Sequence, residues 1–266
     1  MLPKPNDGFA WVQAAAGRAL VCGELQAIAS HLFTTRQWTL GSTIAGPLDE
    51  GWAEVARAMG VEPRQLVRVR QVHGAAVAVH ARGDAHDPDD ASEADIIVSD
   101  DPSISLAIRT ADCVPLLMAD RRTGAVAAAH AGWQGLAAKV PAVAVDALAR
   151  AFGSRPGDLV AATGPSISAA RYEVGVDVRA RFENAGFSQP DLARWFADGD
   201  RPAHWYFDGW QAARDQLEAA GVPASQIHVA GLCTATYPDL FCSYRRDGSP
   251  SGRLAAAIRA RDAHGA

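Results

Sequence analysis

A succession of short apolar segments in the middle of the chain is the feature that most restricts its fold. These segments are rich in valine, isoleucine and alanine, and glycine, proline or aspartate separates many of them. Such segments are too short for most buried helices and are typical of strands. We predict strands at residues 66–72, 75–80, 94–98, 105–109, 114–119, 125–130, 159–163 and 226–230.

Longer segments before, between and after these strands predict helices at 52–59, 136–152, 177–185 and 209–220. Gly221 follows the last of them, in the position where helices commonly end. Pro141 allows two starts for the second helix, near residue 136 or near Val140, because proline is tolerated only in the first turn. Grouped strands with helices around them indicate mixed β-structure covered by helices. Since no linker or repeat is recognisable, we predict one domain spanning residues 1–266.

Composition places the chain among ordinary globular proteins and argues against several classes of partner. Hydrophobic residues make up 48%, charged residues 21%, and the mean hydropathy is -0.05. The net charge of -5 lacks the basic excess of a dedicated nucleic-acid binder, so a small-molecule substrate is the better expectation. No apolar run approaches the ~20 residues of a membrane span, and the N-terminus lacks a secretion signal. The four cysteines form no C-x-x-C pair, and we expect a cytoplasmic protein with reduced thiols.

Residues 120–124 separate two of the predicted strands and have the composition of a turn. If the first residue of this turn pairs with Ala125, then His130 lies opposite Pro115 in an antiparallel hairpin. Cys113 is two residues from Pro115 and therefore points to the same face as His130. The two become diagonal neighbours, with Cα atoms roughly 7–8 Å apart. A slip by one residue would place them on opposite faces, so a shared site depends on this register.

Cys113, His130 and His73 are candidate ligands of a soft metal ion. Each lies beside a glycine or at a strand end, and their separations are too long for a local zinc finger. Two imidazoles and one thiolate that leave a fourth position open are typical of a catalytic zinc site. Without a metal, Cys113 and His130 would form a dyad in which the imidazole activates the thiol as a nucleophile. The residues alone do not distinguish these two sites, and spacing does not place His73.

Several motifs, in a fixed order along residues 31–253, resemble those of one protein family. The motifs are Gln71-Val72-His73-Gly74, Ala94-Asp95-Ile96-Ile97-Val98, Arg109-Thr110-Ala111-Asp112-Cys113-Val114-Pro115, Ala129-His130-Ala131-Gly132-Trp133-Gln134-Gly135, Gly164-Pro165, Tyr172-Glu173-Val174-Gly175, Cys233-Thr234 and Ser243-Tyr244-Arg245-Arg246-Asp247-Gly248. Together they resemble the YfiH family, which is also labelled the laccase-domain or multicopper polyphenol oxidoreductase family.

The resemblance implies an α+β fold, a four-layer α-β-β-α sandwich with mixed sheets, similar to that of the cytotoxic necrotizing factor toxins. It implies a zinc-dependent purine nucleoside phosphorylase that cleaves adenosine, inosine, guanosine or methylthioadenosine with phosphate. Adenosine deamination is a further implied activity. The metal ligands of the family, which are also its catalytic residues, correspond to His73, Cys113 and His130 here. The relation to the toxins makes a metal-free Cys–His hydrolase or amidase an alternative.

Residues in or near the motifs are candidates for binding the nucleoside and phosphate. Arg36 and Arg245 carry cations that can hold phosphate. Gly132 lies where a strand passes into a helix, whose free N–H groups can bind an anion. Trp133 can stack on a purine, and Gln134 stands where the family commonly has arginine. Each of these residues also has an ordinary structural explanation, as part of a surface ion pair, a turn or the core.

The laccase label of the family predicts copper chemistry, which the histidine pattern does not favour. Multicopper enzymes use closely paired His-x-His ligands, and no two of the eight histidines are separated by a single residue. A single copper ion can still replace zinc, because it binds such ligands more tightly, and would give a laccase-like polyphenol oxidase. The remaining alternative is a metal-binding interaction protein without catalysis, whose partner proteins the sequence does not identify.

Overall fold

Two six-stranded sheets and one three-stranded sheet form in the computed structural model, which describes residues 2–41, 50–84 and 92–261. The first sheet has the order β1-β2-β3-β15-β7-β4, with bounds Phe9–Ala14, Gly17–Cys22, Ala29–Thr34, Leu254–Ala260, Ser105–Thr110 and Leu66–Val67. The second has the order β14-β10-β8-β9-β6-β5, with bounds Ile227–Val229, Leu159–Thr163, Val114–Asp120, Val126–Ala131, Ile96–Ser99 and Val77–His80. Both combine parallel and antiparallel pairs, so the prediction of mixed sheets is confirmed.

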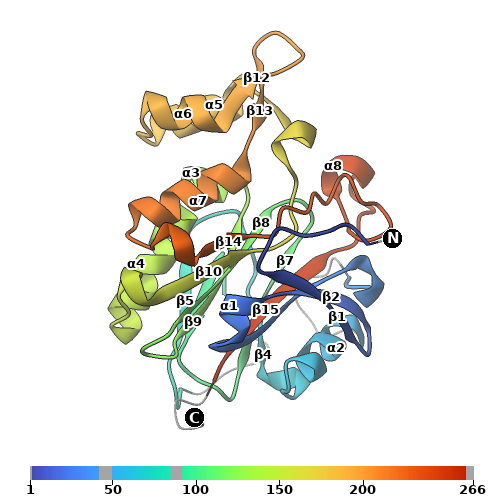
Figure 1. Ribbon diagram of the computed structural model, residues 1–266, viewed down its shortest axis with the longest axis vertical. Helices are drawn as coiled ribbons and strands as arrows, with labels where there is room; N and C mark the ends of the chain where they lie inside the picture. Colours follow the sequence, from blue (N-terminus) through green and yellow to red (C-terminus); the bar gives the residue numbers. More distant parts are fainter. Residues whose placement is uncertain (1, 42–49, 85–91, 262–266) are drawn as a thin grey trace.

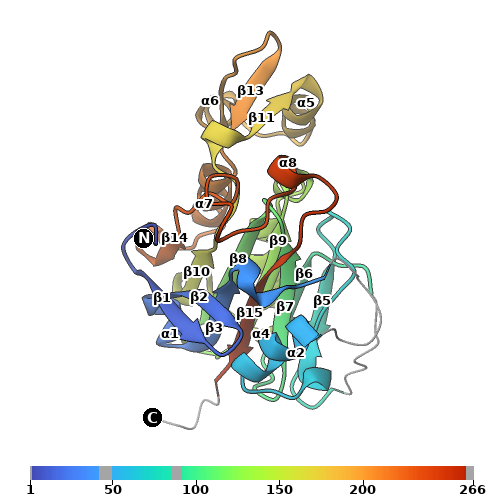
Figure 2. The same ribbon diagram turned by 90° about the vertical axis from the view of Figure 1, so that its right-hand side faces the viewer.

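The two large sheets share one apolar core and lie against each other in Figure 1 and Figure 2. Alternate residues of β8 point in opposite directions: Leu117 enters this core, and Leu116 packs toward the helices outside. Phe33 and Ile108 of the first sheet enter the same core. Because both faces of β8 are covered, its sequence is apolar almost throughout and does not alternate.

Helices cover the outer faces of both large sheets. Helix α2 (Glu50–Ala58) packs Trp52 and Val55 on the first sheet, whereas α4 (Val140–Phe152) and α7 (Gly209–Ala219) pack on the second. Figure 1 shows α2 on one side of the two sheets and α4 and α7 on the other. The remaining α-helices are α1 (Gly23–Gln26), α3 (Trp133–Ala137), α5 (Val176–Asn184), α6 (Gln189–Trp195) and α8 (Tyr244–Asp247). Among the residues described, no helix has the length and apolar character that crossing a bilayer requires.

A third sheet projects beyond the helices at the top of Figure 1. Its strands, in the order β11-β13-β12, are Glu173–Gly175, His204–Phe207 and Phe196–Asp198. The rings of Phe182 in α5, Trp195 in α6 and Phe207 pack together beside it. The sequence predicts only the helix at 177–185 in this region, because strands of three or four residues are too short to display a period.

The hairpin predicted around residues 120–124 forms in the expected register. The N–H of Asp120 donates to the carbonyl of Ala125 at 2.9 Å, and His130 lies opposite Pro115. Gly124 closes the turn with a φ of 78°, in the left-handed region that glycine adopts at little cost. The strand positions on which the Cys113–His130 prediction depends are therefore confirmed.

Two predicted elements are wrong in extent. The strand predicted at 66–72 ends at Val67, because the following backbone turns toward the second sheet and gives its N–H groups to a carboxylate there. The helix predicted at 136–152 is two helices, α3 and α4, with Lys139 between them in a left-handed conformation (φ 62°). Pro141 lies in the first turn of α4, so the alternative start near Val140 is confirmed.

The sequence analysis did not predict strands β1, β2, β3 and β15. The sequence of β15, Leu-Ala-Ala-Ala-Ile-Arg-Ala, favours a helix when it is taken alone. It is instead paired on both sides, with β3 and β7, and its alanines are buried. Burial between two neighbouring strands therefore outweighs the intrinsic preference of alanine.

The buried imidazole of His31 in β3 predicts a loss of stability in mild acid. Its Nε2 accepts a hydrogen bond from the N–H of Cys22 at 2.9 Å, and burial lowers its pKa to about 4. The unfolded chain, with a histidine pKa of ~6.5, binds the proton more readily, so the free energy of unfolding decreases below that pH. Between pH 8 and pH 5 this group should remove about 2 kcal/mol, measured by urea denaturation.

His31→Gln is the matched control, because an amide oxygen can accept the same hydrogen bond but does not titrate. We expect the decrease between pH 8 and pH 5 to be smaller in this variant by about the same 2 kcal/mol. Equal pH dependence in the two proteins would contradict the assignment to His31.

Candidate metal centre and cavity

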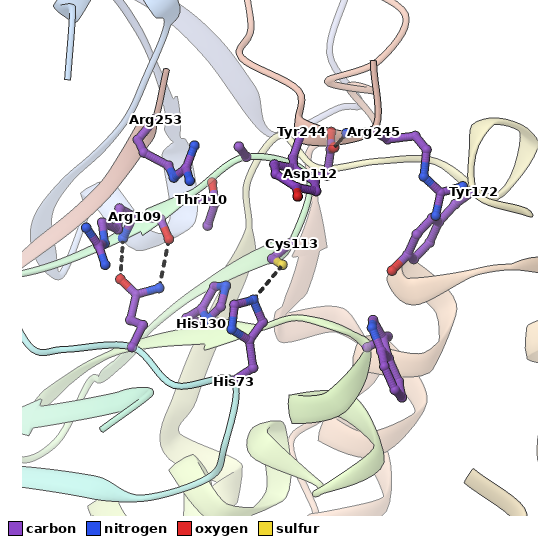
Figure 3. A pocket seen from close by; sticks show the side chains of 13 residues that line it. His73, Arg109, Thr110, Asp112, Cys113, His130, Tyr172, Tyr244, Arg245 and Arg253 are labelled. Atoms are coloured by element: carbon purple, nitrogen blue, oxygen red, sulfur yellow. Dashed lines mark hydrogen bonds between the residues drawn. The ribbon is translucent and has the colours of Figure 1, made fainter. Parts of the chain in front are cut away.

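His73, Cys113 and His130 converge at one end of the two large sheets (Figure 3). His130 lies near the end of β9, while His73 and Cys113 lie in two connections, β4 to β5 and β7 to β8, that cross from the first sheet to the second. Their potential ligand atoms all lie within 4.8 Å of one another. The Sγ of Cys113 is 3.9 Å from Nε2 of His73. The three side chains that the sequence predicts as ligands therefore form one cluster.

The fully buried carboxylate of Asp95 holds two of these three residues in place. Its Oδ1 lies 2.8 Å from Nδ1 of His130, which leaves Nε2 of that ring for the cluster. It also accepts hydrogen bonds from the backbone N–H groups of Val72 (3.2 Å), His73 (3.1 Å) and Gly74 (2.7 Å). Although burial opposes its ionisation, the hydrogen bonds from His130 and Gly74 lower the pKa of Asp95. One anionic side chain thus orients the imidazole of His130, as is common beside metal-bound histidines, and also anchors the backbone of His73.

The charges of the cluster favour the thiolate form of Cys113. Burial opposes ionisation of the Cys113 thiol, but the neighbouring imidazoles of His130 and His73 outweigh it and lower its pKa to about 6. Burial also favours the neutral form of His130, whereas the Cys113 thiolate and Asp95 raise its pKa to about 9. The thiolate is the form of cysteine that binds metals.

The donor set fits a soft transition-metal ion. Two imidazole nitrogens and one thiolate sulfur are ligands that both zinc and copper accept. Gly132 keeps the space beside them open, since a Cβ at this position would lie 2.9 Å from the Sγ of Cys113 and 3.1 Å from His73. Within the described ranges, these are the only three His, Cys, Asp or Glu residues so grouped. The structure therefore supports one mononuclear centre with three protein ligands.

The cluster opens into a cavity of about 520 Å³ with two chemically different sides. Arg109 and Arg253 line one side and come from the first sheet and the residue preceding its strand β15. Tyr172 and Arg245 line the other side together with Trp133. In the view of Figure 3, Arg109 and Arg253 lie on one side of Cys113 and Tyr172 lies on the other.

On the cationic side, Gln71 holds the backbone of Arg109 in place. The side-chain amide of Gln71 donates to the carbonyl of Arg109 at 2.8 Å, and its oxygen accepts from the N–H of the same residue at 2.9 Å. Burial, followed by the positive charges of Arg253 and Arg68, lowers the pKa of Arg109 to about 10. A bound anion would relieve this repulsion, so the side is suited to phosphate or a carboxylate.

The aromatic side is tied to the cysteine loop through Asp112. This residue has a φ of 92°, and its carboxylate accepts from the hydroxyl of Thr234 at 2.5 Å and from the N–H of Arg245 at 2.6 Å. The guanidinium of Arg245 lies 4.6 Å from the ring centroid of Tyr172. The loop that carries Cys113 is therefore anchored to the opposite wall of the cavity.

The predicted substrate-binding residues fall into two groups. Trp133 and Arg245 line the cavity, and Gly132 lies directly beside Cys113. Arg36 and Gln134 are not among the lining residues. The Arg36 guanidinium donates to the carbonyl of Pro238, and Gln134 is exposed on α3. Substrate binding by these five residues stays a prediction.

The sequence analysis missed the roles of Asp95, Arg109, Tyr172 and Arg253. The first three lie within the recognised motifs, but their spacing assigns them no partner. Pairing β6 with β9 would have revealed Asp95, since Ile96 is opposite Ala129 and the next residues are Asp95 and His130. For Arg253 no local signal exists, because its place depends on a strand that was not predicted.

The chain is similar in sequence and in fold to several known proteins. The sequence model for multi-copper polyphenol oxidoreductase laccases matches residues 47–261. A purine nucleoside phosphorylase of Deinococcus radiodurans is 39% identical over 243 residues, which are 86% of this chain and 88% of the relative. The adenosine deaminase RL5 of an unknown prokaryotic organism is 37% identical over 210 residues, 77% of this chain and 78% of the relative. The hypothetical protein YfiH of Bacillus licheniformis has a crystal structure that matches with a TM-score of 0.82 and 27% identity, over 94% of this chain and 99% of that chain.

Gly132→Ala should weaken metal binding without disturbing the backbone. Gly132 has φ -69° and ψ 174°, which alanine adopts freely, but the added methyl group would displace the Cys113 sulfur. We expect the zinc affinity of the metal-free protein to fall about tenfold or more, measured by competition with a chromogenic chelator. Gly157→Ala is the control, since a Cβ there meets nothing within 4 Å. Unchanged affinity in Gly132→Ala would contradict the placement of the sulfur in the site.

Proposed function

Because the chain belongs to the multi-copper polyphenol oxidoreductase laccase family, we propose that it is a zinc-dependent purine nucleoside phosphorylase. The Deinococcus radiodurans relative of that name aligns with most of the chain. The observation that carries the proposal is the cavity, whose cationic and aromatic sides flank the three candidate ligands. Its substrates are purine nucleosides and phosphate.

Phosphorolysis needs a nucleophile and a leaving group on different sides of one carbon atom. Phosphate forms a bond to C1′ of the ribose while the bond from C1′ to N9 of the purine breaks. Arg109 and Arg253 are placed to hold the phosphate, and Trp133 and Tyr172 offer aromatic surface to the purine. The ribose then lies between the two sides, next to Cys113.

His73, Cys113 and His130 would hold the metal ion, and we assign zinc to this position. A zinc ion bound there supplies a Lewis acid that polarises an oxygen atom of a bound substrate. Asp95 holds the imidazole of His130 and the backbone of His73, and Gly132 leaves room for the sulfur. One copper ion suits the same ligands, and a laccase-like oxidase would then be a secondary property of the copper form.

Deamination of adenosine is the second candidate, since RL5 bears that name. Zinc deaminases use a carboxylate near the metal to move protons. Asp112 is the only Asp or Glu side chain among the residues lining the cavity in the described structure, and both of its oxygens already accept hydrogen bonds. The cavity is thus better equipped for phosphorolysis, and deamination would be the slower reaction.

Two further alternatives remain for the same residues. A metal-free hydrolase would use Cys113 as a nucleophile, supported by its lowered pKa and the adjacent histidines. A metal-binding protein without catalysis would leave the cavity unexplained.

We also infer that the layering is the four-layer α-β-β-α sandwich of the family and the toxins, in a single domain. The four free cysteines support a cytoplasmic location.

Purified protein loaded with one equivalent of zinc should convert inosine to hypoxanthine only when phosphate is present. We expect Cys113→Ala to lower kcat/KM about 100-fold or more because it removes a metal ligand. Base release is followed by chromatography and metal content by elemental analysis. Cys22→Ala is the control, since this thiol is buried in the core away from the cavity.

Different results would favour the alternatives. Phosphate-independent turnover that survives chelation would indicate the metal-free hydrolase, and release of ammonia from adenosine without base release would indicate the deaminase. Full phosphorolysis by Cys113→Ala would refute the site. No turnover of any purine nucleoside at full zinc occupancy would refute the phosphorylase.

Replacing an arginine on the cationic side of the cavity should raise the KM for phosphate more than the KM for the nucleoside. Arg253→Met keeps much of the side-chain volume but removes the charge, so the KM for phosphate should rise about tenfold or more while the KM for inosine changes little. Steady-state kinetics with each substrate varied in turn measures both. Arg150→Met, an exposed change on α4, is the control. An equal rise in both KM values would contradict a phosphate site at Arg253.

A further inference from the structure

Tyr172 is held rigidly at the junction between the core and the third sheet. It lies between a 3₁₀ turn, Ala169–Arg171, and strand β11. Its backbone N–H donates to the carbonyl of Ala169 at 2.9 Å, and its carbonyl accepts from the N–H of Phe207 at 3.0 Å. These two backbone hydrogen bonds therefore hold the Cα of Tyr172, from which its side chain extends, in a fixed position.

The ring of Tyr172 is fixed as well. The guanidinium of Arg245 lies 4.6 Å from the ring centroid, and its Nη1 donates to the carbonyl of Glu173 at 2.8 Å. Figure 3 shows the hydroxyl of Tyr172 pointing into the cavity, toward the side on which Cys113 lies. The cation on the ring thus orients the phenol toward the space in which a substrate would bind.

The hydroxyl of Tyr172 can donate a hydrogen bond to a bound molecule. Within the described part of the chain, no group accepts a hydrogen bond from it, whereas the hydroxyl of Tyr206 in the adjoining third sheet donates to Asp200 at 2.6 Å. Burial, and then the negative charge of Cys113, raise the pKa of Tyr172. The phenol stays protonated throughout the pH range of an enzyme assay and acts as a hydrogen-bond donor.

We propose that Tyr172 is a catalytic residue that donates a hydrogen bond to the purine as it leaves, a role that rests on the proposed phosphorylase function. When the N9–C1′ bond breaks, its electron pair goes to the purine, and a phosphate oxygen forms the new bond to C1′. Tyr172 stabilises the negative charge that develops on the ring and keeps its own proton. The free base takes the proton that it finally carries from solvent water.

A comparison of two nucleosides tests this role. The purine of 7-methylinosine is positively charged before reaction, so it leaves without developing net negative charge. We expect Tyr172→Phe to lower kcat/KM for inosine about 30- to 100-fold, and to lower it for 7-methylinosine less than about threefold. Tyr206→Phe, which removes a hydroxyl from the adjoining third sheet, should leave both values unchanged. Zinc content is measured for each protein.

The outcomes separate the two proposals. An equal loss with both nucleosides in Tyr172→Phe would show a structural role, and no loss with inosine would show no role, so either result overturns the donor assignment alone. A wild-type protein that cleaves neither nucleoside with phosphate overturns the phosphorylase itself, before any variant is compared.

Discussion

The carboxylate of Asp95 is the group on which the arrangement of the site depends. A buried anion is costly unless it is surrounded by donors, and Asp95 has backbone N–H groups from one connection and an imidazole from β9. These donors can reach it only if the chain after β4 turns toward the second sheet. The same turn brings His73 to His130, so one electrostatic requirement determines both the end of a strand and the position of two candidate ligands.

The three parts of the cavity have different structural origins. The first sheet supplies the arginines, the second sheet and the connections into it supply the candidate metal ligands, and the junction with the small third sheet supplies Tyr172. Asp112 links these parts, because its backbone leads into Cys113 while its side chain holds Arg245. Movement of the third sheet relative to the core would therefore be transmitted through Arg245 and Asp112 to the loop that carries Cys113.

The sequence predicted the centre of the site better than its surroundings, for a physical reason. Cys113 and His130 are related by one tight turn, whose composition determines the register, so their proximity follows from local rules. Asp95 depends on the pairing of β6 with β9, which no turn specifies. Arg253 precedes β15, an alanine-rich strand that only burial between two neighbours makes extended. Most strands of the second sheet were predicted because both of their faces are apolar, whereas the short strands of the third sheet carry too few residues to show a pattern.

The register of the β8–β9 hairpin also determines how metal ions would affect folding. If β8 and β9 paired with their register shifted by one residue, the imidazole of His130 would lie on the opposite face of the sheet. Such a chain would lack the three candidate metal ligands in one place. Metal ions present during synthesis would then discriminate between correctly and incorrectly aligned chains, because their binding energy is added only to the former. Metal binding by the three candidate ligands would in this way also favour the correct alignment of the strands.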